Sequence, residues 1–447
     1  MCQHDHETVE PVTISRRGVL ASAALLAGVA GAAGPWAATA SAAPPPSPGR
    51  GRPPRFGGTP PVPPPLVIHG GPMLDPKTGA VTDDAVVVLR AGRVLDAGTW
   101  DQTRGARAAV GGAAQQIDVR GAWVLPGLVD AHVHVNALAD AAGILRAGAT
   151  TVRSGASNFY QDVAMRPLTT WTPGRVPRMR AAGTFISPIL GDTVLGDEAL
   201  APLASLPGGV QDPADLRYFT AVNLSRGVDV IKTRANPRAG LAEQDPLELV
   251  YDEEQLSAVV AEARRGKAGV LCHAYSAEGC RGAVRAGIAS LEHGVFVDEE
   301  TLDLMARRRT AFTPTMAAIT GLLDSSDPVL IERGREYVPV LQEALRSAHA
   351  KGVPIVAGTD TFGTATQPVG KEVRLIAEAG IPALDALRGA TTTAAALLGL
   401  ADRVGRLARG YHADVVAVDG NPLDDPAACE RVLLVVAQGA INRNDIG

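Results

Sequence analysis

Eight short apolar runs, separated by helix-like segments, fill the middle of this 447-residue chain from about Leu125 to Leu400. The runs are WVLPGLVDAHVHV, GATTVRSG, PRMRAAG, VDVIKTRA, AGVLCHAY, IASLEHG, TAFTPTM and GVPIVAGTD. Short apolar runs that alternate with helices are typical of buried parallel strands joined by crossover helices. Eight such units fit a (β/α)8 barrel, which typically takes about 250 residues. The sequence therefore predicts an α/β protein with a (β/α)8 TIM barrel.

The same alternation also fits a doubly wound open sheet. A dinucleotide-binding sheet of that kind usually carries G-x-G-x-x-G after its first strand, and this chain has no such motif there. One barrel helix can be delimited from local signals. In YDEEQLSAVVAEARRGKAG, Asp252 is the expected N-cap, Gln255 completes a capping box, and Gly266 or Gly269 ends the helix.

The two flanks of the barrel have β character. Residues 66–124 contain short β-type runs broken by turn residues, and residues 401–447 contain ADVVAVDG and RVLLVVAQGAI. We expect both flanks to build one small β-sandwich domain, with the barrel over residues 125–400. Residues 43–65 are rich in Pro, Gly and Arg and predict a semi-rigid linker.

The N-terminus carries the pattern of an export signal. Arg16 and Arg17 stand directly before an apolar run, and small residues lead to Ala42, after which we expect cleavage. Residues 1–42 resemble a bacterial twin-arginine signal, which predicts export to the periplasm, the cell wall or the extracellular space. An uncleaved membrane anchor is the alternative, but the apolar run is shorter than the roughly 20 residues that span a bilayer.

Composition and cysteine content exclude several classes of protein. The net charge is −5, and no block of like charge is present, which argues against nucleic acid and an anionic membrane surface as partners. Cys272, Cys280 and Cys429 remain after the signal and lack C-x-x-C spacing, which argues against a disulfide framework and a thiolate zinc site. We expect buried free thiols, with a Cys272–Cys280 bridge as the alternative.

His132 and His134, in the first apolar run, are the first candidate metal ligands. Side chains alternate along a strand, so both imidazoles point to the same side, and Asp130 lies on that side too. An H-x-H pair by itself is equally consistent with packed or solvated histidines. Other residues have to decide between these interpretations.

Further polar side chains stand at the ends of later runs. His273 lies near the end of AGVLCHAY, His293 near the end of IASLEHG, and Asp360 ends GVPIVAGTD. The carboxyl ends of barrel strands form the rim at which barrel enzymes place their chemistry. Each residue alone also fits a capping or hydrogen-bonded role. Together with the first pair, they predict a metal site at this rim.

Lys232, in VDVIKTRA, is the most informative member of the set. Burying its ammonium among Val230 and Ile231 is costly, and a protonated amine cannot bind a cation. A buried ion pair or a lysine that reaches solvent is one interpretation. The other is a lysine that has taken up carbon dioxide, because the resulting carbamate has two anionic oxygens that can bridge two divalent ions.

With these residues the chain resembles the metal-dependent amidohydrolase superfamily, in the branch of the imidazolonepropionase-like amidohydrolases and the Xaa-Pro and Xaa-Arg dipeptidases. The resemblance runs from Leu66 to the C-terminus and includes the closing GRLARGYHADVVAVDGNPLDD. It implies two divalent metal ions as cofactors. Zinc is expected from imidazole and carboxylate ligands, with manganese or cobalt as alternatives.

The resemblance also implies a role for each candidate residue. The implied ligands are His132, His134 and Asp360 for the more buried ion, His273 and His293 for the more exposed ion, and carboxylated Lys232 between the two. A metal-bridging hydroxide would be the nucleophile, and Asp360 the general base that passes a proton to the leaving amine. Tyr275, two residues beyond His273, is expected to bind the substrate's carboxylate or the developing oxyanion.

The expected function is therefore an exported hydrolase that cleaves a carbon–nitrogen bond of a small substrate, such as a dipeptide or an N-acyl amino acid. The chain departs from many relatives in two loops. It has Arg153 and Ser154 where relatives carry RD, and ISPILGDTVLG where they carry GGH. These loops shape the pocket, so the resemblance does not name the substrate, and the oligomeric state is equally open.

Three alternatives differ in chemistry. A mononuclear zinc deaminase on the same barrel would show H-x-x-E, but Ser276 stands at the position of the Glu and Glu278 is out of step. Such an enzyme would also give Lys232 no role. A lactonase would use the same site on another bond. A non-catalytic extracytoplasmic metal-binding protein could lose the general base, yet Asp360 is present.

Overall fold

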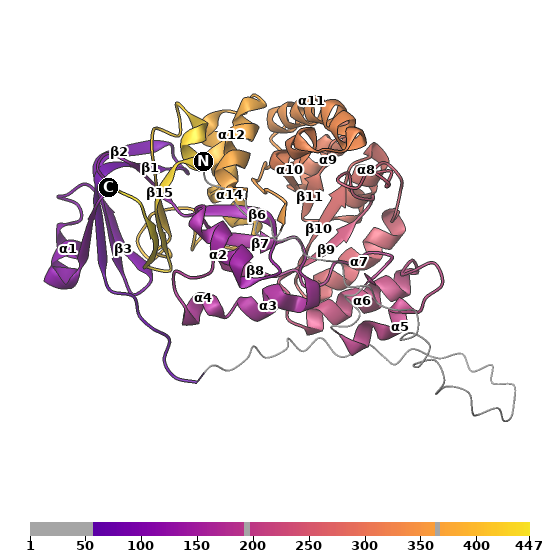
Figure 1. The fold of residues 1–447 in the computed structure, drawn as a ribbon, viewed down its shortest axis with the longest axis horizontal. Coiled ribbons are helices and arrows are strands. Elements are labelled where there is room, and N and C mark those ends of the chain that lie inside the picture. Colours follow the sequence, from indigo (N-terminus) through magenta and orange to yellow (C-terminus); the bar gives the residue numbers. More distant parts are fainter. Residues whose placement is uncertain (1–56, 192–196, 363–366) are drawn as a thin grey trace, which may run out of the picture. The chain divides into compact units, whose positions relative to one another are not determined.

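The computed structural model describes residues 57–191, 197–362 and 367–447. The predicted signal peptide and the predicted linker up to residue 56 lie outside the described residues. Strands and helices alternate along the middle of the chain, as expected for an α/β fold (Figure 1). In the described ranges, no helix is both long and apolar enough to cross a membrane.

Both ends of the chain contribute to one eight-stranded sheet, in the order β16-β15-β14-β5-β1-β2-β3 with β4 beside β1. The strands are β1 (Leu66–Asp75), β2 (Ala80–Arg90), β3 (Arg93–Gly98), β4 (Gln115–Asp118), β5 (Trp123–Pro126), β14 (Val415–Val418), β15 (Val432–Ala437) and β16 (Ala440–Asn444). Figure 1 shows indigo strands of the N-terminal flank near yellow strands of the C-terminal flank. The antiparallel pairing of β14 with β5 joins the two flanks.

Alternation along the strands gives this sheet two buried faces. Val87 and Val436 belong to the hydrophobic cluster on one face, so residues from both ends of the chain share a core. Val86 and Val88 pack on the other face with the end of α1 (Arg104–Val110). In the described residues the strands form one continuous ladder. The separation into two packed sheets that a sandwich requires therefore stays a prediction.

The middle of the chain forms two four-stranded parallel sheets, ordered β12-β11-β10-β9 and β13-β6-β7-β8. Their strands are β6 (Leu128–His134), β7 (Ala149–Ser154), β8 (Arg178–Arg180), β9 (Val230–Arg234), β10 (Gly269–Ala274), β11 (Ser290–His293), β12 (Ala311–Thr313) and β13 (Thr361–Phe362). The α-helices that accompany them are α2 (Leu138–Arg146), α3 (Gln161–Met165), α4 (Leu168–Trp171), α5 (Ala201–Ala204), α6 (Pro213–Ser225), α7 (Glu253–Arg265), α8 (Ala277–Ala286), α9 (Glu299–Arg308), α10 (Met316–Gly321), α11 (Pro328–Ala350), α12 (Val369–Glu378), α13 (Ala383–Gly389) and α14 (Thr392–Leu397). Helices α7 and α8 contact β10 (Figure 1).

The predicted closed ladder of eight strands is not seen among the described residues. The run at 352–360 forms no regular strand, and Ile355 makes only an isolated bridge to Phe312. The backbone of this run still donates and accepts hydrogen bonds with β12 on one side and β6 on the other. Pro354 has no N–H to donate, and Asp360 has a left-handed φ of 55°, so the run does not stay extended.

A second seam separates β8 from β9. The N–H of Asp229 donates to the carbonyl of Ala181 at 2.7 Å, and the N–H of Ile186 donates to the carbonyl of Lys232 at 3.0 Å. These bonds cross the seam without forming a regular ladder. Gly183 lies between the two contacts with a φ of 66°, which turns the chain away from an extended strand. The sheet is therefore interrupted at two places.

Two local predictions are confirmed. Helix α7 begins after Asp252, whose carboxylate accepts the N–H of Gln255 at 2.9 Å, while the Gln255 side chain accepts the N–H of Asp252 at 2.9 Å. Gly266 is its C-cap. The cysteines of the described chain are all free and buried, and they are Cys272, Cys280 and Cys429. The alternative disulfide is therefore not formed.

Gly127 carries the chain from the flank sheet into the barrel, so the first predicted run is two strands, β5 and β6. The N–H of Gly127 donates to the carbonyl of Asp414 at 2.8 Å. A Cβ at this position would lie 2.1 Å from Thr150 Oγ1, which is far inside van der Waals contact, so no larger residue fits. This close passage fixes the start of β6, and with it the histidines near its end.

Candidate metal centre and active site

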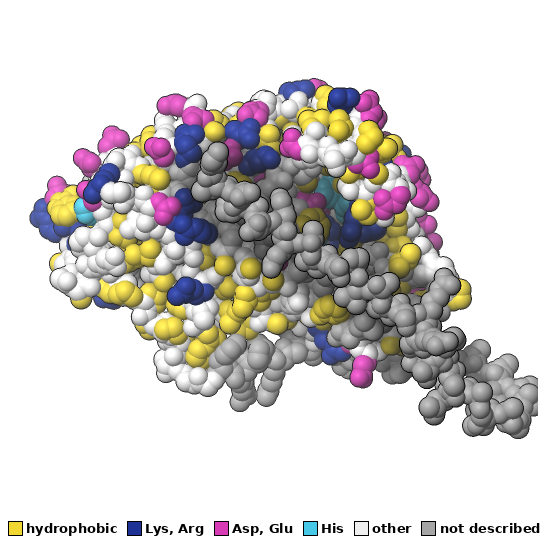
Figure 2. Space-filling view, in the orientation of Figure 1, with side chains coloured by type: hydrophobic (Ala, Val, Ile, Leu, Met, Phe, Trp, Pro, Cys, Tyr) yellow, Lys and Arg dark blue, Asp and Glu magenta, His cyan; other side chains and the backbone are white. Residues whose placement is uncertain are grey.

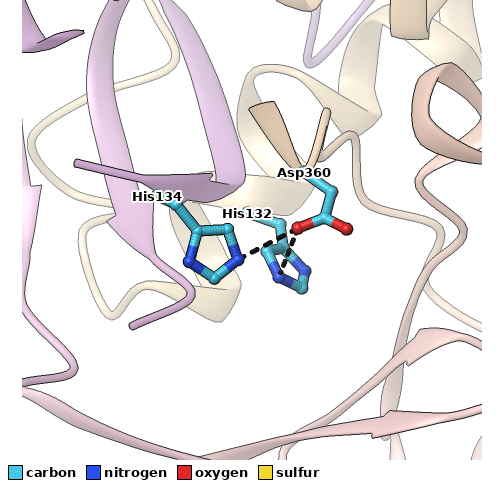
Figure 3. Close-up of side chains that lie close together, drawn as sticks. All are labelled: His132, His134 and Asp360. Carbon is cyan, nitrogen blue, oxygen red and sulfur yellow. Dashed lines mark ion pairs between the residues drawn. The ribbon is translucent and has the colours of Figure 1, made fainter. Parts of the chain in front are cut away.

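His132 and His134 lie near the C-terminal end of β6, and Asp360 faces them (Figure 3). Oδ1 of Asp360 is 3.0 Å from His134 Nε2 and 3.3 Å from His132 Nε2. One ligand atom from each residue lies within 4.8 Å of the other two, close enough for the three to share an ion. The N–H of Asp360 donates to the carbonyl of His132 at 2.8 Å, which holds the acid beside the imidazoles.

The other three predicted ligands lie at the same place. Lys232 on β9 has its Nζ 2.9 Å from His132 Nε2. The His293 ring on β11 has its centroid 5.5 Å from that of His132 and 4.3 Å from that of His273 on β10. The fold thus brings together six residues from β6, β9, β10, β11 and the turn before β13. Their roles as ligands remain predictions.

Each of the four imidazoles has one ring nitrogen held by another protein group. The contacts are His132 Nδ1 to Glu292 Oε2 (2.7 Å), His134 Nδ1 to Ala156 O (3.1 Å), His273 Nε2 to Pro237 O (2.8 Å) and His293 Nδ1 to Thr315 Oγ1 (2.7 Å). The opposite nitrogens of His132 and His134 face other members of the cluster, Lys232 and Asp360. Nε2 of His293 is buried and has no hydrogen-bond partner among the described residues.

A buried carboxylate that the sequence analysis did not single out supports His132. Oε1 of Glu292 accepts hydrogen bonds from Arg153 Nη2 at 2.9 Å and from Ser290 Oγ, while Oε2 contacts His132. Burial alone would raise the pKa of Glu292, but the charges of Arg153 and His132 lower it below its usual range. The anionic carboxylate therefore fixes the orientation of the His132 ring.

The sequence signal for Glu292 is its position directly before His293 in SLEHG. Alternation along β11 would send these two side chains to opposite sides. His293 instead has a left-handed φ of 69°, so the strand is no longer extended there. Glu292 contacts His132, and the His293 ring also lies beside it, so both side chains reach the same cluster.

Burial sets the protonation of the cluster. It lowers the pKa of His132 to about 4 and that of His293 to about 3, so both rings are neutral at pH 7. Burial also lowers the pKa of Lys232 to about 8. For Asp360, burial acts to raise the pKa, but the neighbouring imidazoles lower it well below its usual value. Neutral imidazoles and an ionised carboxylate are the forms that bind divalent cations.

A cleft of about 950 Å³ opens onto His134. Phe185, Arg234, Arg238 and Phe362 contribute to its lining. The Phe362 ring stacks on that of His134 with centroids 4.0 Å apart. Figure 2 shows histidine atoms in a recess of the visible face, with acidic and basic side chains mixed around it. The cleft therefore meets the histidine cluster at His134.

The family model for the Amidohydrolase family matches residues 123–441, which include all six clustered residues. The chain belongs to this family. The predicted superfamily is therefore confirmed, and the comparisons support an α/β fold that resembles a TIM barrel.

Relatives of this amidohydrolase are similar over different lengths. An ochratoxinase from Aspergillus niger is 31% identical over 217 residues, which cover 47% of this chain and 45% of that protein. The match thus spans less than half of the ochratoxinase. A solved structure of a Xaa-Pro dipeptidase with bound methionine has a TM-score of 0.72 and 26% identity, and covers 85% of this chain and 100% of its own. A prolidase complexed with N-methylphosphonate-L-proline has a TM-score of 0.70, 26% identity and the same coverage.

Tyr275 and Asp130, which the sequence also singled out, have different surroundings in this amidohydrolase. The Tyr275 ring stacks on His293 with centroids 5.0 Å apart, so it lies beside the cluster, and burial raises the pKa of its hydroxyl. Asp130 shares a side of β6 with the histidines but is engaged elsewhere. Its carboxylate accepts hydrogen bonds from the hydroxyl and the N–H of Thr359, at 2.7 and 3.1 Å.

Proposed function

We propose that this protein is an exported metal-dependent hydrolase that holds two divalent ions and cleaves the amide or peptide bond of a small substrate, such as a dipeptide or an N-acyl amino acid. One observation carries the proposal. Four clustered imidazoles each have one nitrogen held by a protein group outside the six candidate ligands, and they lie next to Asp360 and Lys232. Histidine ligands of catalytic metal ions are held in this way.

The donor set fits two ions. The more buried ion would be held by His132, His134 and Asp360, the more exposed ion by His273 and His293, and carboxylated Lys232 would bridge them. The buried Nε2 of His293 supports this assignment, because a buried polar atom without a partner is expected to have an unseen ligand. Imidazole and carboxylate donors favour zinc.

When bound, the ions would polarise the substrate carbonyl and lower the pKa of water to supply a nucleophile at neutral pH. Asp360 would accept the proton of the attacking water and return it to the leaving nitrogen. The neighbouring imidazoles hold the pKa of Asp360 below its usual value, so its carboxylate is ionised at neutral pH. The Tyr275 hydroxyl, which is protonated at that pH, would donate to the substrate's carboxylate or the oxyanion.

We also propose a closed barrel, a composite β-sandwich and an N-terminal export signal. Residues 125–400 would form a closed (β/α)8 barrel, and the hydrogen bonds that cross both seams support closure. Residues 66–124 and 401–447 would form the composite β-sandwich, supported by the core that both flanks share. Residues 1–42 would be a twin-arginine signal followed by the 43–65 linker, which places the mature enzyme outside the cytoplasm.

Deamination is less well supported as the reaction of this site than hydrolysis of an amide bond. Ser276, at the position where a deaminase would carry Glu, caps α8 by accepting the N–H of Gly279 at 3.1 Å. Glu278 lies in the first turn of α8 and lines a small pocket with Arg281 rather than the main cleft. A deaminase would also leave the buried amine of Lys232 without a function.

Metal analysis and a substrate screen test the proposal. Protein purified with Zn²⁺ and bicarbonate is expected to hold about two ions per chain, as two-metal hydrolases do. Chelation should abolish hydrolysis, and Zn²⁺ should restore it. The screen covers dipeptides, N-acyl amino acids, lactones and amidated aryl compounds. A content of one ion per chain would contradict the binuclear site. Release of ammonia from an amino heterocycle would favour a deaminase. Turnover of lactones alone would favour a lactonase.

A further inference from the structure

Arg234 stands on β9 two residues after Lys232, so both side chains lie on the same side of the strand. It contributes to the lining of the cleft that opens onto His134. The Phe185 ring centroid is 5.7 Å from Lys232 Nζ and 4.4 Å from Arg234 Cζ. The guanidinium and the proposed bridging lysine thus lie near the same aromatic ring. A small substrate bound at the cluster can reach Arg234.

The guanidinium of Arg234 is buried without a counter-ion. The residue is only 9% exposed, and its Nε has no hydrogen-bond partner among the described residues. Its charge lies against the Phe185 ring, and no carboxylate of the described chain forms an ion pair with it. A guanidinium stays protonated at neutral pH, so the Arg234 side chain keeps its charge. A buried cation without an anion is costly to fold.

Arg153 is an arginine of the same fold that has a structural role, and it can be compared with Arg234. It is also buried, but its donors reach the carbonyl of Ala131 at 2.6 Å, Ser290 Oγ at 2.7 Å and Glu292 Oε1 at 2.9 Å. The positive charge of Arg153 is therefore compensated by protein groups. Arg234 differs because the described residues give its Nε no acceptor and its charge no carboxylate partner.

The acidic side chains that line the same cleft do not supply this partner. Glu243, Asp245 and Glu248 contribute to its lining but are exposed, and none forms an ion pair with Arg234. Solvent screens exposed charges far more than buried ones. Among the described residues of the lining, Arg234 is therefore the buried cation, while Arg238 and the three acids are exposed.

We propose that Arg234 is a carboxylate-binding subsite with Phe185 as its aromatic wall, and that it selects substrates in which a free carboxylate lies next to the scissile amide. This inference rests on the proposed function. A guanidinium offers parallel donors that match both oxygens of a carboxylate. The Phe185 face would pack against the apolar part of the same residue of the substrate. The subsite would thus bind the amino acid that leaves.

Two substrates with the same scissile bond test the proposal. N-acetyl-L-phenylalanine carries the carboxylate, and N-acetylphenethylamine lacks it. We expect kcat/KM of the native enzyme to favour the acid by about 100-fold, since charge-assisted bidentate pairs are strong. Arg234→Gln should remove most of that preference while changing kcat/KM for the neutral amide by less than about 3-fold. Arg234→Lys should keep part of it, because the charge remains but the fork is lost.

Arg335→Gln is the matched control, because Arg335 is exposed on α11 and lies outside the cleft lining. It should behave as the native enzyme. Metal content of Arg234→Gln should equal that of the native protein, and its unfolding midpoint should not be lower, because the variant removes a buried unpaired charge. Equal loss of activity on both substrates, or loss of metal, would overturn the subsite in favour of a structural role.

A binding measurement separates this inference from the proposed function. Calorimetry with 3-phenylpropionate and with 3-phenylpropanol, on the metal-loaded protein, requires no turnover. We expect the carboxylate to bind at least about 10-fold more weakly to Arg234→Gln than to the native protein or Arg335→Gln. If the carboxylate binds equally to all three, the subsite is wrong even where amides are hydrolysed. If binding depends on Arg234 but no amide is cleaved, the subsite stands and the proposed function fails.

Discussion

At the residue scale, two carboxylates of the cluster occupy different surroundings. The Glu292 side chain is fully buried and is held by Arg153, whereas the Asp360 side chain is 16% exposed beside His134. A carboxylate whose oxygens are both engaged by protein groups orients its neighbours. One that faces the imidazoles at the edge of the cleft can accept a proton from a reactant. These surroundings support a positioning role for Glu292 and the proposed role of Asp360 in proton transfer.

Replacing Asp360 by Asn is expected to lower kcat by about 100-fold to 10,000-fold, which is the usual contribution of a general base. The amide keeps the size of the side chain but cannot take up the proton. The ions should remain bound through the other ligands. Kinetics with metal analysis on the same sample checks both statements, and full activity of the variant would remove Asp360 from the role of base.

Glu292→Gln is expected to weaken metal binding by about 10- to 100-fold, because the partner that orients His132 loses its charge. The variant also leaves Arg153 buried without an anion, so the free energy of unfolding should fall by about 3 kcal/mol. Competition with a chelator and urea unfolding measure the two effects. Glu262→Gln is the control, because Glu262 pairs on α7 with the largely exposed Arg265 and should change neither quantity. Unchanged metal affinity in Glu292→Gln would contradict the positioning role.

At the scale of elements, a buried acid joins two helices of the barrel. Glu372, on α12, accepts the N–H of Met316 at 2.8 Å and that of Ala317 at 2.7 Å, at the start of α10. Its oxygens satisfy two donors that the short helix cannot satisfy itself. Burial nevertheless raises the pKa of Glu372 to about 8. The contact between α12 and α10 is therefore sensitive to pH.

The pH dependence of stability should report this carboxyl group. Its pKa in the folded state is about 8, above its ordinary value of 4.5. Between pH 4.5 and about pH 8, Glu372 is therefore protonated in the folded protein and ionised in the unfolded protein. The contribution of Glu372 to stability is complete below pH 4.5 and is lost as the pH rises to about 8. Between pH 5 and pH 8, the free energy of unfolding of the native protein, measured in urea, should fall by about 2 to 4 kcal/mol more than that of Glu372→Gln. Glu378→Gln, on the same helix but exposed, should follow the native protein. Equal pH slopes in all three proteins would refute the assignment.

At the scale of the whole molecule, the C-terminal flank is part of the structure that leads to the active site. β14 pairs with β5, which runs through Gly127 into β6 and its histidines. The carbonyl of Asp414, next to β14, accepts the N–H of Gly127. The two ends of the chain therefore have to meet before β6 has its final position.

A chain that ends at Leu400 should fail to fold into active protein. It would lose β14, β15 and β16, and would expose the edge of β5 together with the apolar residues that face Val415 and Val436. Soluble yield, circular dichroism and metal content measure the effect. Removing only residues 445–447 leaves every strand intact and should be tolerated. A soluble, metal-binding product that ends at Leu400 would show that the flank sheet is dispensable.

Local signals along the sequence were sufficient for much of this protein. Seven of the eight apolar runs contain a regular strand, and the eighth, which ends at Asp360, does not. The limits of α7 followed from Asp252, Gln255 and Gly266, because capping depends on neighbours in the chain. The six candidate ligands could be selected as polar residues placed in or at the ends of apolar runs. Their types and spacing were also enough to indicate the family.

Only the tertiary structure decided what surrounds those residues. Glu292 and Arg153 look like ordinary polar residues of two strands. The contacts of Glu292 with Arg153 and with His132 join segments more than 130 positions apart. The left-handed backbone of His293 and the two seams of the sheet depend on how neighbouring strands pack, which no local pattern encodes. The missing partner of Arg234 is likewise a property of the folded cleft, because the cost of burying a charge arises only when the chain has closed around it.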